Sequence, residues 1–217
     1  MLANTANHPE IADLSFDLLI TPEFFGIDVA VRVIDTDQTV LTILADKEEI
    51  GSVGATGMKS RFFENTVAEV MNAMGDYSEL KLRRALKNSK VLSSDVSAAF
   101  DPNFPSVMTR TNTAYFGKGL VFNKYTGSRG KGGASDASAE LVGYARRIFD
   151  ENGVIWQMAE LGKVDQGGGG TVAAYMANRN IVTVDAGVPV LSMHAPMEII
   201  SKLDCYMSMR ACKAVYE

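Results

Sequence analysis

Apolar residues occur in two patterns along this chain. Some form short continuous runs, and others form longer stripes at helical spacing. Short apolar runs predict strands at residues 28–34, 40–45, 90–95, 118–124, 154–159 and 180–185, with a weaker alternation at 14–20. Apolar stripes and their end signals predict helices at 60–74, 78–87, 135–152 and 196–217, and a short helix after residue 171. Strands that alternate with helices indicate an α/β fold with a mostly parallel central sheet flanked by helices.

The stretch at residues 39–52 carries the clearest strand signal. Its apolar run ends abruptly at the charged segment Asp46-Lys47-Glu48-Glu49. Open α/β sheets build their sites at the carboxyl ends of strands, and successive side chains of an extended segment point in opposite directions. Glu48 and Glu49 could therefore serve two different centres, one a metal and one a water. The alternative is a solvated acidic turn.

Two more chemically versatile residues stand where predicted strands end. Asp95 closes the run at 90–95, and His194 follows an apolar run at 190–193, after a turn predicted at 186–189. A helix N-cap is the alternative for Asp95, and a hydrogen-bonded core histidine is the alternative for His194. With Glu48 and Glu49 they make a plausible zinc set of three acids and one imidazole.

Two glycine-rich loops could bind anionic groups through their backbone N–H groups. The segment 125–133 is basic but lacks the spacing of a phosphate-binding P-loop. Four glycines at 167–170 precede the short predicted helix, which suits contact with a carboxylate or a tetrahedral intermediate. A bare tight turn explains the same four glycines equally well. Ser135 or Asp136 is the predicted cap of the helix that follows the first loop.

Composition and charge exclude some classes of protein. The net charge of −5 argues against a nucleic-acid partner, and no apolar run reaches the ~18–20 residues that cross a bilayer. Cys205 and Cys212 lie seven positions apart on a predicted helix, too far for a disulfide bond. Reduced thiols, a cytoplasmic location and one domain over residues 1–217 are the expectations that follow.

Several longer segments resemble the aspartyl aminopeptidase family of co-catalytic zinc metallopeptidases, in the right order and over about residues 39–217. They are DKEEIGSVGATGM at 46–58, SSDVSAAFDPNFP at 93–105, KYTGSRGKGG at 124–133, GKVDQGGGGT at 162–171 and VDAGVPVLSMHAP at 184–196. The resemblance implies a zinc-aminopeptidase-like three-layer fold and a metallo-aminopeptidase that removes N-terminal, possibly acidic, residues from peptides by two-metal hydrolysis. It also implies two zinc ions, with cobalt or manganese as other candidates, and assembly into homo-oligomers.

The resemblance assigns roles residue by residue. Glu48 matches the general base, Glu49 and His194 match ligands of one zinc, and Asp95 matches a ligand of the other. Lys118 and the glycine run, with Gly168 and Gly169, match stretches that line the substrate site.

The chain departs from the family at its N-terminal side. The family places another histidine ligand in an N-terminal half of the catalytic domain and then inserts a β-rich dimerisation domain, and we expect neither part within residues 1–217. The bridging aspartate has its nearest match in Asp28, within Gly26-Ile27-Asp28-Val29-Ala30. An alternative function follows: a catalytically impaired remnant of the family that serves as a structural or assembly module.

Overall fold

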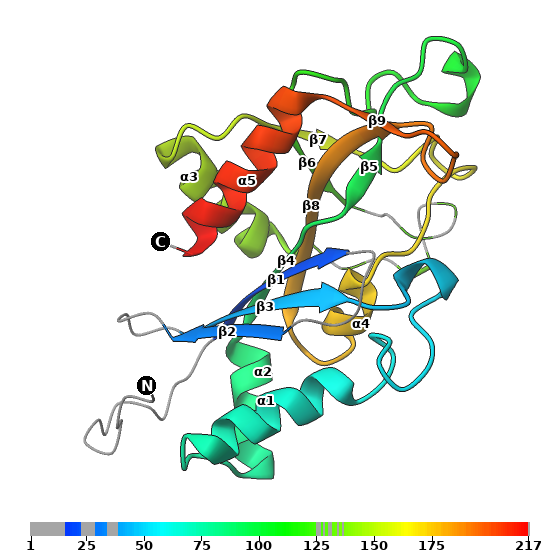
Figure 1. Ribbon diagram of the computed structural model, residues 1–217. Helices are drawn as coiled ribbons and strands as arrows, with labels where there is room; N and C mark the ends of the chain where they lie inside the picture. Colours follow the sequence, from blue (N-terminus) through cyan, green and yellow to red (C-terminus); the bar gives the residue numbers. More distant parts are fainter. Residues whose placement is uncertain are drawn as a thin grey trace.

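A computed structural model shows a mixed sheet whose strands lie in the order β2-β3-β1-β4-β8-β6-β7 (Figure 1). It describes residues 39–216 except 125, 126, 128, 130, 131, 134 and 136, and the backbone of the strands at 16–22 and 29–33. The strands are β1 (Phe16–Pro22), β2 (Val29–Val33), β3 (Thr39–Ala45), β4 (Lys90–Ser93), β5 (Val96–Ala98), β6 (Leu120–Asn123), β7 (Trp156–Ala159), β8 (Val182–Leu191) and β9 (Ile199–Ile200). The helices are α1 (Phe62–Ala73), α2 (Glu79–Asn88), α3 (Ala139–Glu151), α4 (Ala173–Ala177) and α5 (Lys202–Tyr216), with 3-10 turns η2 (Glu48–Ile50) and η3 (Pro105–Val107).

The centre of the sheet is parallel, as the alternation of strands and helices predicts. Strands β3, β1, β4 and β8 run in one direction, whereas β2 pairs antiparallel with β3 at the edge. On the other side of β8, β6 runs antiparallel to it and parallel to β7. The carboxyl ends of β3, β4 and β8 therefore lie on one edge of the sheet.

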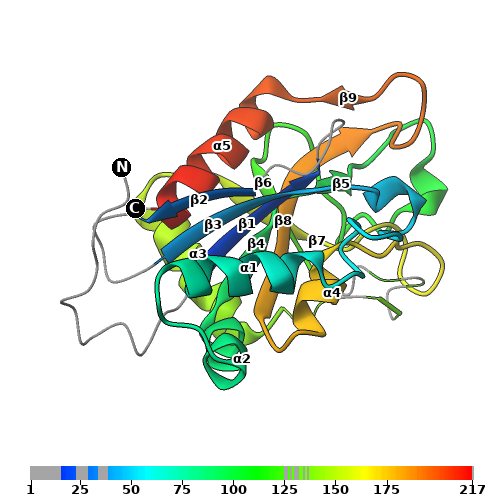
Figure 2. The same cartoon turned by 60° about the horizontal axis from the view of Figure 1, so that its bottom comes forward.

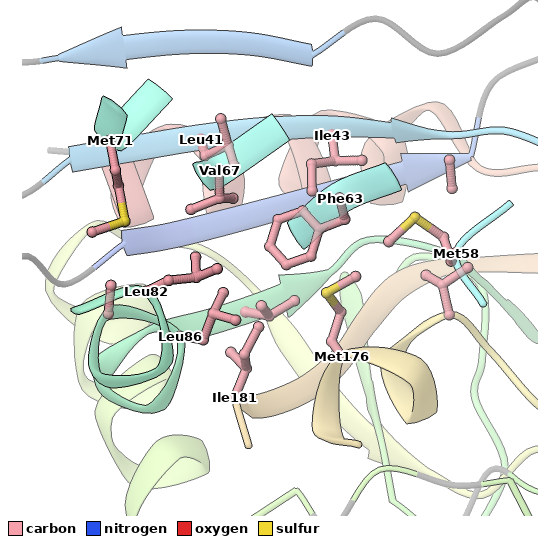
Figure 3. Packing of buried hydrophobic residues seen from close by; sticks show 14 residues of the cluster. Leu41, Ile43, Met58, Phe63, Val67, Met71, Leu82, Leu86, Met176 and Ile181 are labelled. Atoms are coloured by element: carbon pink, nitrogen blue, oxygen red, sulfur yellow. The ribbon is translucent and has the colours of Figure 1, made fainter. Parts of the chain in front are cut away.

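Helices cover both faces of the sheet and give three layers. Figures 1 and 2 show α1, α2 and α4 on one face and α3 and α5 on the other. On the first face, buried side chains of β3 meet the apolar stripe of α1 and the inner side of α2 (Figure 3): Leu41, Ile43, Phe63, Val67, Met71, Leu82 and Leu86. A second core lies under α3 and α5, with Phe122 stacked on Phe149 at 5.3 Å between ring centroids. Each fully buried side chain of this size stabilises the fold by roughly 1.5–3 kcal/mol.

One predicted turn is wrong. Residues 186–189 belong to β8, which runs unbroken from Val182 to Leu191. The Val188 N–H donates to Asp95 O, and Ala99 N–H donates to Val190 O, so β5 holds this half of the strand. Pro189, which lacks an N–H, falls between the part of β8 paired with β6 and the part paired with β9.

The predicted start of the last helix at Pro196 is also wrong. The chain first pairs as β9 with the end of β8, and α5 begins only at Lys202. Ile200 in β9 and Leu203 in α5 are exposed, whereas Met207, Ala211 and Ala214 of α5 are buried. Similarly, Ser138 rather than Ser135 or Asp136 caps α3, because its side chain accepts a hydrogen bond from Leu141 N–H.

Two smaller observations concern the cysteines and the helices. Cys205 and Cys212 are both free thiols, the first exposed and the second partly buried. None of the helices in the described part of the chain combines the length and apolarity needed to cross a bilayer.

Candidate active site

Three turns that follow parallel strands form the candidate site. Glu48 and Glu49 follow β3, Asp95 follows β4, and His194 follows β8. In Figure 2 the turn after β3 and the turn after β8 lie on the same side of the sheet. The spacing of the strand ends in the sequence predicted this convergence, since the carboxyl ends of parallel neighbours share one edge.

The turn after β3 is tightly folded, which determines where Glu48 and Glu49 project. Lys47 and Gly51 are both left-handed, with φ of 59° and 88°, and Gly51 N–H donates to Glu48 O at 2.8 Å. The Asp46 carboxylate accepts a hydrogen bond from the Thr56 hydroxyl at 2.6 Å and forms an ion pair with the Lys47 ammonium at 2.9 Å. The Thr56 hydrogen bond lowers the pKa of Asp46, followed by the bond and charge of Lys47. Asp46 therefore anchors the turn.

Glu49 and His194 meet across the two turns. The Glu49 Oε2 atom lies 3.1 Å from His194 Nδ1, and both side chains are largely exposed, at 72% and 67%. His194 has a φ of 65°, Ser192 has a φ of 59°, and the His194 N–H donates to the Glu198 carboxylate. Two left-handed non-glycine residues in one short turn store backbone strain, a feature that clusters at functional sites.

The carboxylates of Glu48 and Asp95 interact with this pair. Burial raises the pKa of Glu48 to about 6, helped by the negative charges of Asp95 and Glu49 and opposed by His194. Burial also raises the pKa of Asp95, opposed first by a 2.7 Å hydrogen bond from Val96 N–H. Glu49 and His194 are thus close enough to influence the pKa of both Glu48 and Asp95. The helix-cap alternative for Asp95 is wrong, because strand β5 follows it.

The donor atoms fit a metal ion in part. Two ligands of a tetrahedral zinc, each ~2.0 Å from the ion, lie about 3.3 Å apart, close to the separation of Glu49 and His194. Among the described residues, however, no three His, Cys, Asp or Glu side chains lie close enough together to hold one ion. Asp95 therefore remains outside coordination range of the pair. The candidate Asp28 lies outside the described residues.

The predicted substrate residues lie in two loops. Lys118 is exposed in the turn before β6, and because β6 is antiparallel to β8 this turn lies toward the edge where β8 ends. Gly168 has a φ of 104°, which favours glycine, and the run at 167–170 leads into α4 as expected. The structure places Lys118 and the glycine run on different loops.

One anchor of the glycine run was absent from the sequence-based prediction. The Thr171 hydroxyl lies 2.9 Å from each carboxylate oxygen of Asp185, and both residues are buried. A signal was available, because Asp185 is an acid at the end of the apolar run at 180–185. A buried acid of this kind needs a partner, and the residue directly after the glycine run supplies one.

Comparison with known proteins identifies relatives of one family. The family model described as aminopeptidase I zinc metalloprotease (M18) matches residues 27–216. A probable M18 family aminopeptidase 1 of Clostridium acetobutylicum is 63% identical over 169 residues, which cover 78% of this chain and 36% of that protein. A protein of the same description from Borreliella burgdorferi is 48% identical over 182 residues, covering 83% of this chain and 40% of that protein.

Solved structures agree. The crystal structure of aminopeptidase I from Clostridium acetobutylicum matches with a TM-score of 0.75 and 57% identity, over 83% of this chain and 38% of that one. An M18 aminopeptidase from Thermotoga maritima matches with a TM-score of 0.80 and 43% identity, over 83% of this chain and 40% of that one. The chain thus spans about two fifths of the length of these relatives. By sequence and by fold, it belongs to the M18 family of zinc metalloproteases.

Proposed function

We propose that this chain carries zinc-dependent aminopeptidase chemistry, which removes N-terminal residues, preferentially acidic ones, from peptides by two-metal hydrolysis. One observation supports this proposal above the others. Glu49 and His194, from the turns after β3 and β8, meet at 3.1 Å, with Glu48 beside them. An exposed pair of potential ligands next to a half-buried carboxyl supplies part of the arrangement that metal-assisted hydrolysis requires.

Glu48 is the general base in this proposal. Its pKa of about 6 lies just below neutral pH, so the carboxylate is ionised and still basic enough to accept a proton from water. Glu48 then returns that proton to the leaving amine. Its neighbour Glu49 contacts His194, and in this proposal Glu49 serves metal binding while Glu48 serves proton transfer.

Glu49 and His194 would hold one ion and Asp95 the other, with Asp28 as the candidate for a bridging ligand. Zinc, when bound, polarises the scissile carbonyl and lowers the pKa of a bound water. Cobalt and manganese share these oxygen and nitrogen ligands. The chain itself contributes the placement of the turns after β3 and β8, which sets the separation of Glu49 and His194 in the metal-free protein.

The peptide is positioned by two loops in this proposal. The exposed ammonium of Lys118 pairs with an acidic side chain, and the backbone N–H groups around Gly168 and Gly169 bind a carboxylate or the developing oxyanion. We further infer a cytoplasmic homo-oligomer that acts on peptides and uses neither nucleic acid nor a membrane as a partner.

Hydrolysis of aminoacyl-nitroanilides by the zinc-loaded chain tests this function. Metal content is measured on the same sample by mass spectrometry, and aspartyl, glutamyl, leucyl and lysyl substrates are compared. We expect bound zinc and faster hydrolysis of the two acidic substrates. Bound zinc without turnover of any substrate would contradict the enzymatic role.

The alternative function is a catalytically impaired member of the family that acts as a structural or assembly module. It is favoured by the incomplete ligand set, since no third ligand lies within coordination range of Glu49 and His194 in the described part of the chain. Under this alternative, wild type and Glu48→Gln are equally inactive. A difference in turnover between these two proteins would exclude it.

A further inference from the structure

A buried carboxylate in α5 holds the turn that carries Lys118. Asp204 lies in the first turn of α5 with 0% of its surface exposed. Its Oδ2 atom accepts a hydrogen bond from Gly117 N–H at 2.8 Å, and its Oδ1 atom accepts one from Gly119 N–H at 2.7 Å. No cation of the described residues lies within ion-pairing distance of it. The two amides and the positive end of the helix therefore compensate its charge.

The rest of the turn is fixed from β7. Gln157 donates to Tyr115 O at 2.9 Å and to Gly119 O at 3.2 Å, and it accepts from Tyr115 N–H at 2.9 Å. A Cβ at Gly119 would lie 1.9 Å from Ile155 O, so the backbone is packed directly against the residue that precedes β7. Side chains from two other elements thus bind the polar backbone groups of a short turn.

Lys118 is the one residue between the two glycines that Asp204 binds. Gly117 and Gly119 have φ of 74° and 82°, and both N–H groups converge on one carboxylate while the Lys118 side chain remains exposed. The starting point of a long, flexible side chain is therefore fixed, which lowers the entropy lost when its ammonium binds a partner.

We propose that Asp204 is a positioning residue that presents Lys118 to the anionic side chain of an acidic N-terminal peptide residue. The proposal rests on the function proposed above for Lys118. Burying an unpaired carboxylate is costly, and an apolar residue would fill the same space without that cost. Both carboxylate oxygens of Asp204 accept hydrogen bonds from the glycines on either side of Lys118. This indicates that the buried carboxylate maintains the geometry of the turn.

A double-mutant cycle on the full zinc-loaded chain tests the proposal. It uses Asp204→Asn, Lys118→Ala and both together, with aspartyl and leucyl nitroanilides as substrates. Asn keeps the shape of Asp but places an NH2 group against one glycine N–H. We expect Asp204→Asn to lower kcat/KM at least tenfold for the aspartyl substrate, mainly through KM, and less than twofold for the leucyl substrate. In the Lys118→Ala background the same substitution should change kcat/KM less than twofold.

Two further proteins control for stability. Val67→Ala removes a buried methyl pair from the opposite face of the sheet and should lower the thermal midpoint without changing the aspartyl-to-leucyl ratio. If Asp204→Asn does not fold, Gly117→Ala replaces it. A Cβ there meets nothing within 4 Å, but the φ of 74° strains the same turn, and the same loss of aspartyl preference is expected.

Readouts that need no turnover separate this proposal from the enzymatic one. Calorimetry measures the binding of L-aspartate, and hydrogen exchange measures the protection of the Gly117 and Gly119 amides. Weaker aspartate binding and faster exchange in Asp204→Asn support the positioning role even if no substrate is cleaved, in which case only the enzymatic proposal fails. Equal losses on both substrates, an undiminished effect in the Lys118→Ala background, or no aspartate binding by wild type would each overturn it.

Discussion

Glu48 and Glu49 are adjacent in the sequence but differ in their surroundings. Glu48 is half-buried, and burial raises its pKa to about 6. The Glu49 side chain is 72% exposed and contacts His194. A carboxyl that is partly withdrawn from water is a stronger base than an exposed one, and an exposed carboxylate is free to bind an ion. The two environments therefore favour the proposed division into base and ligand.

Glu48→Gln tests that division. Removing the base should lower kcat/KM on an aspartyl substrate by about 10²–10⁴-fold, the usual size of general-base catalysis, and leave zinc content unchanged. Steady-state kinetics and metal analysis of the same preparation measure both. Glu69→Gln, an exposed residue on α1, is the matched control and should behave as wild type. Loss of zinc together with activity in Glu48→Gln would instead make Glu48 a ligand.

The two thiols should differ strongly in reactivity. Burial raises the pKa of Cys212 to about 11, so at pH 8 only about one molecule in a thousand carries its thiolate, while Cys205 is exposed. Iodoacetamide at pH 8 should therefore alkylate Cys205 at least ~10-fold faster, as followed by peptide mass spectrometry. Equal rates in the folded protein would contradict the burial of Cys212, and equal rates in urea are the expected control.

At the scale of elements, patterning predicted the existence of helices and strands better than their ends. The apolar run at 40–45 and the stripe of α1 were placed within two residues, because both bury one continuous face. The turn predicted at 186–189 was wrong because the prediction used only the local preference of Gly187 and Pro189 for turns. Strands β5 and β6, which are distant in the chain, pair with this region and keep it extended.

Gly187 has a role in β8 that only the structure shows. A Cβ there would lie 1.8 Å from Asp95 O, at the point where Val188 N–H bonds that oxygen. Gly187→Ala should therefore displace Asp95, reduce zinc binding about tenfold or more and lower the thermal midpoint by several degrees. Gly143→Ala, in α3 with open space around its Cβ, should raise stability by about 0.5–1 kcal/mol. Calorimetry measures the stability of both variants and of wild type, and zinc titration measures their zinc affinity. Equal stability and equal zinc affinity of the two variants would contradict the role given to Gly187.

At the scale of the whole molecule, the sequence predicted which strand ends carry the candidate site but not its geometry. Glu49 and His194 lie 145 positions apart and meet because parallel strands end together. Whether Asp95 joins them depends on how each turn curves, and that is set by left-handed residues such as Ser192 and His194 that no apolar pattern encodes. Asp204 was missed for a related reason, since the helix predicted from residue 196 places this acid in mid-helix, where acids are usually solvated.

The electrostatics of the site should govern the stability of the metal-free protein. Burial raises the pKa of Glu48 and of Asp95, so the folded state holds these protons at a higher pH than the unfolded state does. Between about pH 4.5 and 6 the folded state thus binds more protons, and its stability rises as the pH falls through this window. Asp46, whose pKa is lowered, acts in the opposite direction only below its ordinary value of 3.8.

Thermal midpoints in EDTA at pH 5 and pH 7.5 measure this effect, with Glu48→Gln as the comparison because Gln resembles a protonated Glu. At pH 7.5 the variant should melt about 2 °C above wild type, and at pH 5, inside the window of about pH 4.5–6, the difference should be clearly smaller. Added zinc should remove the difference at pH 7.5, because a cation offsets the repulsion among Glu48, Glu49 and Asp95. A difference that is constant across pH would show that the carboxyl of Glu48 does not titrate in this window, and the shared acidic site would then have to be abandoned.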